Sequence, residues 1–387
     1  MAGERTATEL ITPIVMPKWG LSMSEGKVND WLVEEGTTIE VGMPILDVES
    51  DKIANAVEAT DAGLLRRRIA QPGETLPVKA LLGVMAPPEV SDAEIDAYVD
   101  AYQLPAAGDD EEAQAGPAYA FTEVDGIRVR YARRGGSGGD DDGARTAVLF
   151  LHGFGGDLDN WLFNLDAAAE RAPVVALDLP GHGQSDVKLP GEASLAALAG
   201  FVRRFLDQVG VARVHAVGHS MGGAIAAQLA LDDPPRVASL TLVNPAGLGE
   251  AIEGGYIDGF VQAASRRDLK PVLERLFADP GLVTRQMVDD VLKYKRLDGV
   301  DALLGELGAA LFGGGRQADQ PVARVDAQAL PTSVLWGRED RVIPAAQAGQ
   351  APAGATVRVF DGAGHMLMME RAADVNAAIQ AQVAAAG

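Results

Sequence analysis

The sequence contains no cysteine, which excludes disulfides, cysteine nucleophiles and cysteine-ligated metal sites. It is also poor in basic residues: 33 Lys and Arg stand against 55 Asp and Glu, so the net charge is −22. Nucleic acids and anionic membranes favour clustered Lys and Arg, so neither is an expected partner. No apolar run reaches the ~18 residues that a membrane-spanning helix needs. The N-terminus also lacks the basic-then-apolar pattern of a signal peptide, and we therefore expect a cytoplasmic enzyme.

What the chain does contain is ordinary for a folded protein: 387 residues, of which 47% are hydrophobic and 23% charged. At roughly 100–200 residues per domain, two or three domains are expected. The charge divides the chain, because residues 88–118 hold nine acidic and no basic side chains. Residues 105–118 combine acids with Pro, Ala and Gly, which predicts an extended, self-repelling linker. Residues 91–104 begin with a Ser91/Glu94 capping pair and repeat apolar residues at helical spacing, which predicts a short helix docked on a neighbour.

The first part of the chain repeats itself. Residues 26–48 and 63–85 align at an offset of 37, and Gly36 matches Gly73. Short β-like runs separated by Gly or Pro dominate both copies. Neither copy is large enough to bury its own apolar face, so the repeat predicts an all-β sandwich with quasi-twofold symmetry. The alignment has four identities, and chance similarity between two β meanders is the alternative.

The junction between the two copies carries a candidate functional residue. An E-S-D-K motif occupies residues 49–52, and its last two residues, Asp51 and Lys52, lie between the strand-like segments 43–50 and 53–59. Lys52 is therefore expected at the tip of a hairpin turn. A lysine there is either a solvated surface charge or the attachment point of a long flexible arm. An arm on a tethered domain reaches another active site at an effective concentration in the mM range.

Residues 12–87 resemble the lipoyl domains of the 2-oxo-acid dehydrogenase complexes, whose attachment hairpin the E-S-D-K motif matches. The resemblance implies lipoate in amide linkage on Lys52, placed there by a lipoate-attaching enzyme. Related biotin carriers have Met on both sides of the lysine, so Asp51 and Ile53 argue against biotin. An unmodified turn lysine is the alternative.

From residue 119 on, strand-like and helix-like segments alternate, which predicts a mostly parallel sheet covered by helices. The first two strands, 119–124 and 127–133, are separated only by Asp125 and Gly126, which predicts an antiparallel hairpin. No set of His, Asp and Glu has the spacing of a metal site, so no metal is expected.

Residues 218–222 read G-H-S-M-G and fit the pattern G-x-S-x-G. They follow the strand-like run 213–219 and precede a helix-like run, which is the setting of a nucleophile elbow. The small residues allow close packing of helix on strand and hold Ser220 at a tight, exposed turn. A serine hydroxyl is a weak nucleophile at neutral pH, so it needs a base, and the base needs an orienting acid.

The acid and the base are expected downstream of the serine, in that order. His365 is the only histidine after the G-x-S-x-G segment and is therefore the expected base. Asp340 lies in the loop after strand 331–337 and is the expected acid, with Glu339 as its competitor.

An oxyanion hole needs two backbone N–H donors aimed at the developing charge. One is expected from Met221, which follows the nucleophile directly. The other is expected from Phe154, in the glycine-rich loop 152–156 that follows a strand.

These motifs, together with D-L-P-G-H-G-Q-S at 178–185, resemble the α/β-hydrolase family over residues 119–247 and 326–387. The resemblance implies that residues 248–325 form a helical cap that shapes the substrate site. Ten Lys and Arg fall in this stretch. They are either an ordinary helical surface or an edge that binds the phosphates of coenzyme A.

The expected organisation is a lipoyl domain at 12–87, an acidic helix and linker at 88–118, and an α/β-hydrolase domain at 119–387. This combination resembles the dihydrolipoamide acetyltransferase components of acetoin dehydrogenase complexes. The resemblance implies acetyl transfer from S-acetyl-dihydrolipoyl-Lys52 to coenzyme A at the Ser220 site. It also implies two partners, a thiamine-diphosphate-dependent acetoin dehydrogenase component and dihydrolipoamide dehydrogenase. Ordinary lipoate acyltransferases carry a His-x-x-x-Asp-Gly motif, which this sequence lacks.

Two other functions fit the same motifs. With water as the acceptor, the chain would be a carrier-linked serine hydrolase or thioesterase. Without catalysis, it would be a lipoyl carrier with a scaffold domain, which the complete set of Ser220, Asp340 and His365 disfavours. Within the transferase, the acetyl group passes either through Ser220 or directly between the two thiols with His365 as base.

Overall fold

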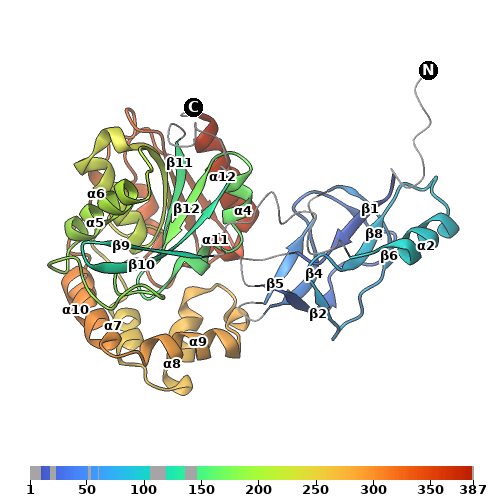
Figure 1. Cartoon of the computed structure of the whole chain (residues 1–387), viewed down its shortest axis with the longest axis horizontal. Coiled ribbons are helices and arrows are strands. Elements are labelled where there is room, and N and C mark those ends of the chain that lie inside the picture. The colour runs from blue at the N-terminus through green and yellow to red at the C-terminus, as the bar shows by residue number, and fades with distance from the viewer. Residues whose placement is uncertain are drawn as a thin grey trace. The chain divides into compact units, whose positions relative to one another are not determined.

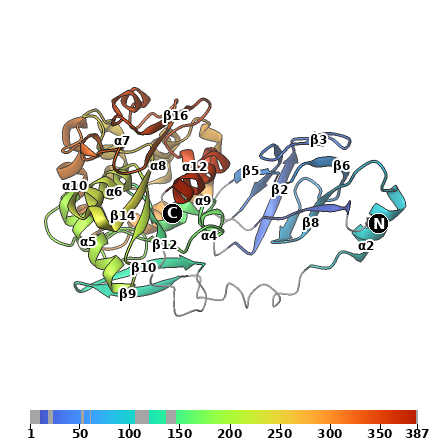
Figure 2. The same ribbon diagram turned by 90° about the horizontal axis from the view of Figure 1, so that it is seen from above.

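The computed structural model describes residues 10–17, 23–50, 54–59, 61–104, 119–135 and 146–385. The chain divides into two compact units, Met1–Ala113 and Gln114–Gly387. Figures 1 and 2 show that the first unit is rich in strands and that helices surround a sheet in the second. No helix within the described ranges combines the length and the apolar character of a membrane span.

The first unit is an all-β sandwich of two four-stranded antiparallel sheets, ordered β1-β8-β6-β3 and β5-β4-β2-β7. Its strands are β1 (Thr12–Val15), β2 (Glu25–Trp31), β3 (Thr38–Ile39), β4 (Pro44–Glu49), β5 (Ala54–Glu58), β6 (Gly63–Arg68), β7 (Thr75–Pro77) and β8 (Leu81–Met85). Fully buried aliphatic side chains from both sheets fill the space between them: Val28, Ile39, Leu46, Val48, Leu65 and Leu82. The predicted sandwich is thereby confirmed.

The internal repeat corresponds to an exchange of strands between the two sheets. β3 of the first copy pairs with β6 of the second, and β7 of the second pairs with β2 of the first. The Gly36 N–H donates to the Leu65 carbonyl, and the Gly73 N–H donates to the Val28 carbonyl, both at 2.7 Å. The two bonds are equivalent, because Gly36 and Gly73, like Val28 and Leu65, are 37 residues apart. Both glycines have a left-handed φ, +86° and +91°, which explains why glycine occupies both positions.

The acidic segment after β8 begins as helix α2 (Asp92–Ala101), which packs on the first unit. Its N-terminus is a capping box: the Glu94 N–H donates to the Ser91 hydroxyl, and the Glu94 carboxylate accepts from the Ser91 N–H at 2.8 Å. Ile95 is buried in an apolar cluster with residues of β8. Arg66 of β6 adds an ion pair of 2.9 Å to the first residue of the helix.

The second unit is built on one eight-stranded sheet, ordered β16-β15-β14-β13-β11-β12-β10-β9. Neighbouring strands are parallel except around β10, which runs antiparallel to both β9 and β12. The strands are β9 (Ala120–Val124), β10 (Ile127–Arg134), β11 (Ala147–Leu151), β12 (Val174–Leu177), β13 (Val214–His219), β14 (Val237–Val243), β15 (Thr332–Gly337) and β16 (Thr356–Phe360). Strands β11, β13, β14 and β15 are buried along their whole length, as parallel strands covered on both faces are.

Helices cover both faces of this sheet and extend beyond one end of it (Figure 1). They are α4 (Leu165–Ala169), α5 (Leu195–Gln208), α6 (Met221–Asp232), α7 (Gly254–Gln262), α8 (Arg266–Leu273), α9 (Arg285–Lys295), α10 (Val300–Phe312), α11 (Leu367–Glu370) and α12 (Ala372–Ala385). Helices α5 and α6 pack together on one face, and α4 and α12 on the other. Helices α7–α10 lie side by side, and residues 248–325, which contain them, are called the cap below.

Candidate active site

Ser220 lies at the turn between β13 and α6, where the backbone is strained. Its φ of +52° and ψ of −120° form a conformation that L residues rarely adopt and that is found at active sites. Glycines are required on both sides by packing. A Cβ at Gly218 would stand 2.4 Å from the Gly222 carbonyl oxygen, and a Cβ at Gly222 would stand 2.2 Å from that of Leu151. The G-x-S-x-G pattern therefore brings α6 against the sheet and fixes the serine at the carboxyl end of β13.

His365 and Asp340 are in direct contact. His365 follows β16, Asp340 follows β15, and the His365 Nδ1 lies 2.8 Å from the Asp340 Oδ2. Both side chains are buried. Because a carboxylate only accepts, Nδ1 carries the proton and Nε2 is left with a lone pair for a substrate or serine proton.

Ser220 and His365 line the same cavity, although no hydrogen bond joins the hydroxyl to the imidazole among the described residues. In free enzymes this bond is often long and tightens only when substrate binds. The structure therefore joins the expected acid directly to the expected base, and the expected nucleophile lines the same cavity as that base.

The Asp340 carboxylate is surrounded by donors. Its Oδ2 also accepts from the side chains of Asn244, at 2.7 Å, and Trp336, at 3.2 Å. Its Oδ1 accepts from the backbone N–H groups of Val342 and Ile343. Every one of these contacts suits a charged acceptor. The sequence analysis missed Asn244, although its position at the carboxyl end of β14 was a signal that could have identified it.

Glu339, the competing acid, has a different partner. Its Oε2 accepts from the Ala363 N–H at 3.0 Å, and its own N–H donates to the Ala363 carbonyl. Glu339 thus supports the loop that precedes His365 and does not contact the imidazole, which leaves Asp340 as the proposed acid.

The loop after β11 is oriented by a histidine. The His152 Nε2 accepts from the Leu179 N–H at 2.9 Å, so its Nδ1 carries the proton and donates to the Gly153 carbonyl at 2.8 Å. In a trans peptide the N–H points opposite to the C=O. The Phe154 N–H is therefore directed away from the His152 ring. The loop also lies close to the nucleophile turn, since a Cβ at position 153 would stand 3.1 Å from the Ser220 Cβ.

Met221, the other expected oxyanion donor, is the first residue of α6. The first N–H groups of a helix have no partner within it, so this group is available to a ligand. The two expected donors thus come from the loop after β11 and from the N-terminus of α6. Their roles in stabilising an oxyanion are a prediction.

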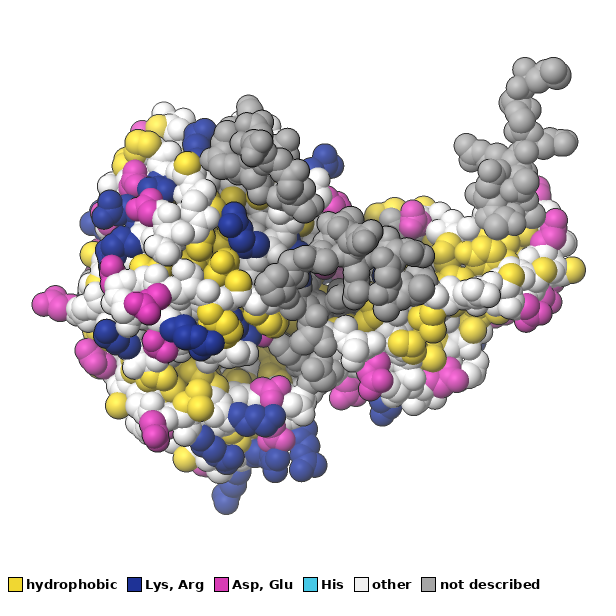
Figure 3. Space-filling view, in the orientation of Figure 1, with side chains coloured by type: hydrophobic (Ala, Val, Ile, Leu, Met, Phe, Trp, Pro, Cys, Tyr) yellow, Lys and Arg dark blue, Asp and Glu magenta, His cyan; other side chains and the backbone are white. Residues whose placement is uncertain are grey.

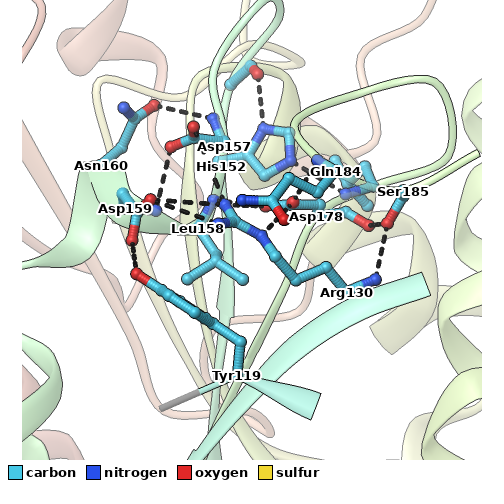
Figure 4. A network of polar contacts seen from close by, with 12 residues as sticks. Tyr119, Arg130, His152, Asp157, Leu158, Asp159, Asn160, Asp178, Gln184 and Ser185 are labelled. Atoms are coloured by element: carbon cyan, nitrogen blue, oxygen red, sulfur yellow. Dashed lines mark hydrogen bonds and ion pairs between the residues drawn. The ribbon is translucent and has the colours of Figure 1, made fainter. Parts of the chain in front are cut away.

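A buried ion pair supports the segment that follows loop 152–156 (Figure 4). Arg130 of β10 donates to both carboxylate oxygens of Asp178, at 2.6 and 3.1 Å. Asp178 follows β12 and begins the D-L-P-G-H-G-Q-S motif. It also accepts from the backbone N–H groups of Leu158 and Gln184. The Asp178 carboxylate thus ties the segment after loop 152–156 to the 178–185 loop, which gives the aspartate of the motif a structural role.

The other four histidines are buried as well. Burial lowers the pKa of each below its usual 6.5: to about 4 for His152, about 3 for His182, about 4 for His215, and well below 6.5 for His219. They stay neutral near pH 7. His219 points its Nε2 at the His365 carbonyl, 2.9 Å away, and thereby supports the backbone of the expected base.

The cavity in front of Ser220 has a volume of about 90 Å³ for the centres of water-sized molecules. Much of its wall comes from apolar side chains of the cap: Ile257, Phe260, Leu273, Phe277, Met287 and Phe312. Such a wall excludes water and accommodates hydrocarbon and sulfur. Among the described residues no group of His, Cys, Asp and Glu could hold a metal ion.

Most basic residues of the cap are paired with acids. Seven of its ten Lys and Arg form ion pairs: Arg266, Lys270, Arg275, Lys293, Lys295, Arg316 and Arg324. Figure 3 likewise shows basic and acidic side chains interspersed over the visible face of the second unit. This favours an ordinary helical surface, and a phosphate-binding edge stays a prediction.

Strands β4 and β5, between which the candidate attachment site falls in the sequence, pair as an antiparallel hairpin. The last described pair of the hairpin is Glu49 with Ala54. Lys52 belongs to the short connection between these two residues and lies outside the described residues. A lysine amine in the connection of a hairpin suits a group held by an amide bond.

Comparison with known proteins follows the same division of the chain. A family model described as biotin-requiring enzyme matches residues 12–85, and one described as alpha/beta hydrolase fold matches residues 146–372. The chain is 63% identical to the dihydrolipoyllysine-residue acetyltransferase component of the acetoin cleaving system of Cupriavidus necator, over 97% of this chain and 98% of that one. The component of the same name from Pseudomonas putida is 49% identical over 95% and 96%. A solved meta-cleavage product hydrolase from Pseudomonas fluorescens shares the fold, with a TM-score of 0.59 and 22% identity over 68% of this chain and 96% of that one.

Proposed function

Because the chain belongs to the family of dihydrolipoyllysine-residue acetyltransferase components of acetoin cleaving systems, we propose that it transfers an acetyl group from a dihydrolipoyl thiol to coenzyme A. The observation that carries the proposal is the His365–Asp340 pair, whose histidine lines the same apolar cavity as the strained Ser220, in a chain that also holds a lipoyl domain. Hydrolases of this fold use the same kind of site, so the acceptor is the point that an experiment must decide.

Lys52 is the residue that would hold lipoate. When bound, lipoate supplies the thiol on which the acetyl group arrives as a thioester. The partners that follow are a lipoate-attaching enzyme, a thiamine-diphosphate-dependent acetoin dehydrogenase component and dihydrolipoamide dehydrogenase. Changing Lys52 to Arg should remove the lipoyl increment from the intact mass and stop turnover in the assembled system. It should leave transfer from free acetyl-dihydrolipoamide unchanged, since the Ser220 site is untouched.

In the first half of the reaction, the Ser220 oxygen attacks the thioester carbonyl while the His365 Nε2 takes the hydroxyl proton. The Phe154 and Met221 N–H groups stabilise the oxyanion, and Asp340 stabilises the imidazolium. As the carbon–sulfur bond breaks, His365 returns the proton to the departing sulfur. Acetyl-Ser220 and a free thiol remain.

In the second half, the coenzyme A thiol gives its proton to His365 and its sulfur attacks acetyl-Ser220. The bond to the serine oxygen breaks, and Ser220 regains the proton. Acetyl-coenzyme A leaves, and the site has returned to its starting state. The apolar cavity favours sulfur over water as the acceptor, because water entering it leaves its own hydrogen bonds unmade.

The proposal is tested by assaying acetyl-dihydrolipoamide with and without coenzyme A. Acetyl-coenzyme A formation that depends on both substrates is expected. Free acetate released equally in both assays would instead favour a carrier-linked hydrolase. No turnover in either would favour a lipoyl carrier with a scaffold domain.

Replacing Ser220 by Ala separates the two routes of transfer. The covalent route predicts a loss of at least about 10³-fold in kcat, because the nucleophile is gone. A near-normal rate would eliminate acetyl-Ser220 and favour direct transfer between thiols with His365 as base.

A further inference from the structure

One carboxylate outside the proposed triad connects the cap with the loop that carries His365. Glu370, the last residue of α11, accepts two backbone hydrogen bonds. Its Oε1 accepts from the Ala278 N–H at 2.7 Å, and its Oε2 accepts from the Gly364 N–H at 2.8 Å. Ala278 lies in the cap, whereas Gly364 directly precedes His365. The two oxygens of a single side chain therefore hold two segments that are far apart in the sequence.

The two segments are also in direct contact. The Met366 N–H donates to the Leu276 carbonyl at 3.0 Å. A Cβ at Gly364 would stand 2.7 Å from the Ala278 nitrogen and 2.8 Å from the Leu276 oxygen, so no side chain fits between them. Leu276 and Phe277 line the cavity. The part of the cap that faces the substrate thus rests on the backbone on either side of the expected base.

The remaining supports of the loop come from the sheet. Asn244 donates to the Gly364 carbonyl at 3.2 Å, and Asp340 accepts from the His365 ring at 2.8 Å. Glu339 accepts from the Ala363 N–H at 3.0 Å. Among these side chains, only that of Glu370 also bonds the cap.

We propose that Glu370 is a positioning residue that fixes the cap segment Leu276–Ala278 and the His365 loop as one unit. The base is then in place only when this wall of the cavity is in place. The inference rests on the proposed function in one respect, the assignment of His365 as the base. It predicts that loss of Glu370 lowers kcat through a displaced imidazole, with a smaller effect on KM.

The ionisation of Glu370 gives a second, independent signature. Burial raises its pKa to about 7, and the charge of Asp340 adds to this rise. The two N–H bonds and the electrostatic interaction with His365 act in the opposite direction. The cation nearest along the chain is Arg371, and Arg341 donates to the Ala278 carbonyl. When Glu370 is protonated, one of its oxygens becomes a donor that faces an N–H group. One of the two bonds is therefore lost as the pH falls through about 7.

The test compares Glu370→Gln with Glu339→Gln. Both residues are partly buried glutamates that hold adjacent N–H groups of the same loop. Glutamine has one accepting oxygen. At position 339 it keeps the single bond, whereas at position 370 it cannot accept from both Ala278 and Gly364. Both variants lose a negative charge, but only Glu370→Gln also loses one of the two hydrogen bonds that join the cap to the His365 loop. Comparing the two variants therefore separates the effect of the lost link from that of the lost charge.

Acetyl transfer to coenzyme A and cleavage of p-nitrophenyl acetate are measured from pH 5.5 to 9. Glu370→Gln should lower kcat on the order of 10–100-fold in both assays, the effect of a misplaced catalytic group. Glu339→Gln should stay within about threefold of the unaltered chain, because its one hydrogen bond survives. As the pH falls through about 7, kcat/KM of the unaltered chain should show an added fall on the order of 10–100-fold that Glu370→Gln lacks, because protonation of Glu370 removes the bond that the variant has already lost. The added fall is sought in the unaltered chain itself, so an unstable variant does not prevent a decision.

Equal effects of the two variants, or an unaltered chain whose kcat/KM shows no added fall near pH 7, would overturn the inference. The assay with p-nitrophenyl acetate allows the role of Glu370 to be judged separately from the proposed acetyl transfer. An enzyme that cleaves the ester but forms no acetyl-coenzyme A would refute the proposed transfer and still decide the role of Glu370. An enzyme inert towards both would refute both.

Discussion

Asp340→Asn changes the proposed triad at the position where two neighbouring acids compete for the role. The substitution keeps the shape of the side chain but turns one accepting oxygen into a donating NH₂. In the structure, Oδ2 accepts from the His365 ring and two other side chains, and Oδ1 accepts from two backbone N–H groups. Whichever way the amide turns, its NH₂ faces at least two donors.

The size of the effect follows from these contacts. If the NH₂ faces the ring, the His365 Nδ1 must accept, its proton moves to Nε2, and the base is blocked; such a wrong tautomer lowers kcat about 10⁴-fold in a serine protease. At least two buried donors also lose their acceptor, at about 1–3 kcal/mol each. We therefore expect a loss of at least about 2 kcal/mol of stability. For a domain of this size, that lowers the melting midpoint by about 4 °C or more.

The assay is steady-state acetyl transfer at saturating coenzyme A, with the thermal midpoint measured on the same samples. Glu339→Gln is the control, because the Ala363 N–H keeps its acceptor. The assignment of Asp340 would be refuted if the control lost as much kcat as Asp340→Asn. It would equally be refuted if Asp340→Asn kept more than about a tenth of the unaltered kcat. An amide that turns its NH₂ to the ring blocks the base, and one that turns its oxygen to the ring lacks the charge that stabilises the imidazolium.

Three further changes test other parts of the site. His152→Ala removes the ring that orients the peptide before Phe154, so steady-state kinetics should reveal a fall in kcat of about 10²-fold, the value of one oxyanion donor. Tyr294→Phe removes a hydrogen bond of 2.6 Å from cap helix α9 to the Gly181 carbonyl, and urea unfolding should detect a loss of about 1 kcal/mol. Glu370→Gln removes a carboxylate whose pKa burial raises from 4.5 to about 7. Because the folded state then binds the proton more tightly than the unfolded state, the stability of the unaltered chain relative to the variant should fall as the pH rises from about 4.5 to 7 and should stay constant above 7. Thermal midpoints of the two proteins that move in parallel across this range would contradict the assignment.

The features that could be predicted from the sequence are those encoded by neighbours in the chain. The nucleophile turn needs small residues at fixed distances from Ser220, and the repeat needs a left-handed glycine in each copy, so both leave a pattern. The strands of the second unit are continuous apolar runs because both faces of the sheet are covered. Such constraints act within a few residues, and a reader of the sequence can see them.

The contacts that hold the site in shape lie beyond such patterns. Glu370 reaches Ala278 across 92 residues, and Asn244 reaches Asp340 across 96. Nothing near either residue marks the partner. The sequence favoured Asp340 over Glu339 but left Glu339 as a competitor for the same reason. Which of two adjacent side chains faces the imidazole depends on how the end of β15 meets the loop after β16.

The selection between transfer and hydrolysis cannot reside in the triad, because hydrolases of this fold share the arrangement of nucleophile, acid and base. In the proposed covalent route, acetyl-Ser220 is open to attack by any nucleophile that His365 can deprotonate. The discrimination must therefore come from what the cavity admits, and its wall is built largely by the cap. Because the cap segment with Phe277 is bonded to the loop of the base through Glu370, a cap displaced enough to admit water also displaces His365. Under the two proposals, this coupling would protect the acetyl group, since the state in which water could enter is the state in which the base is misplaced.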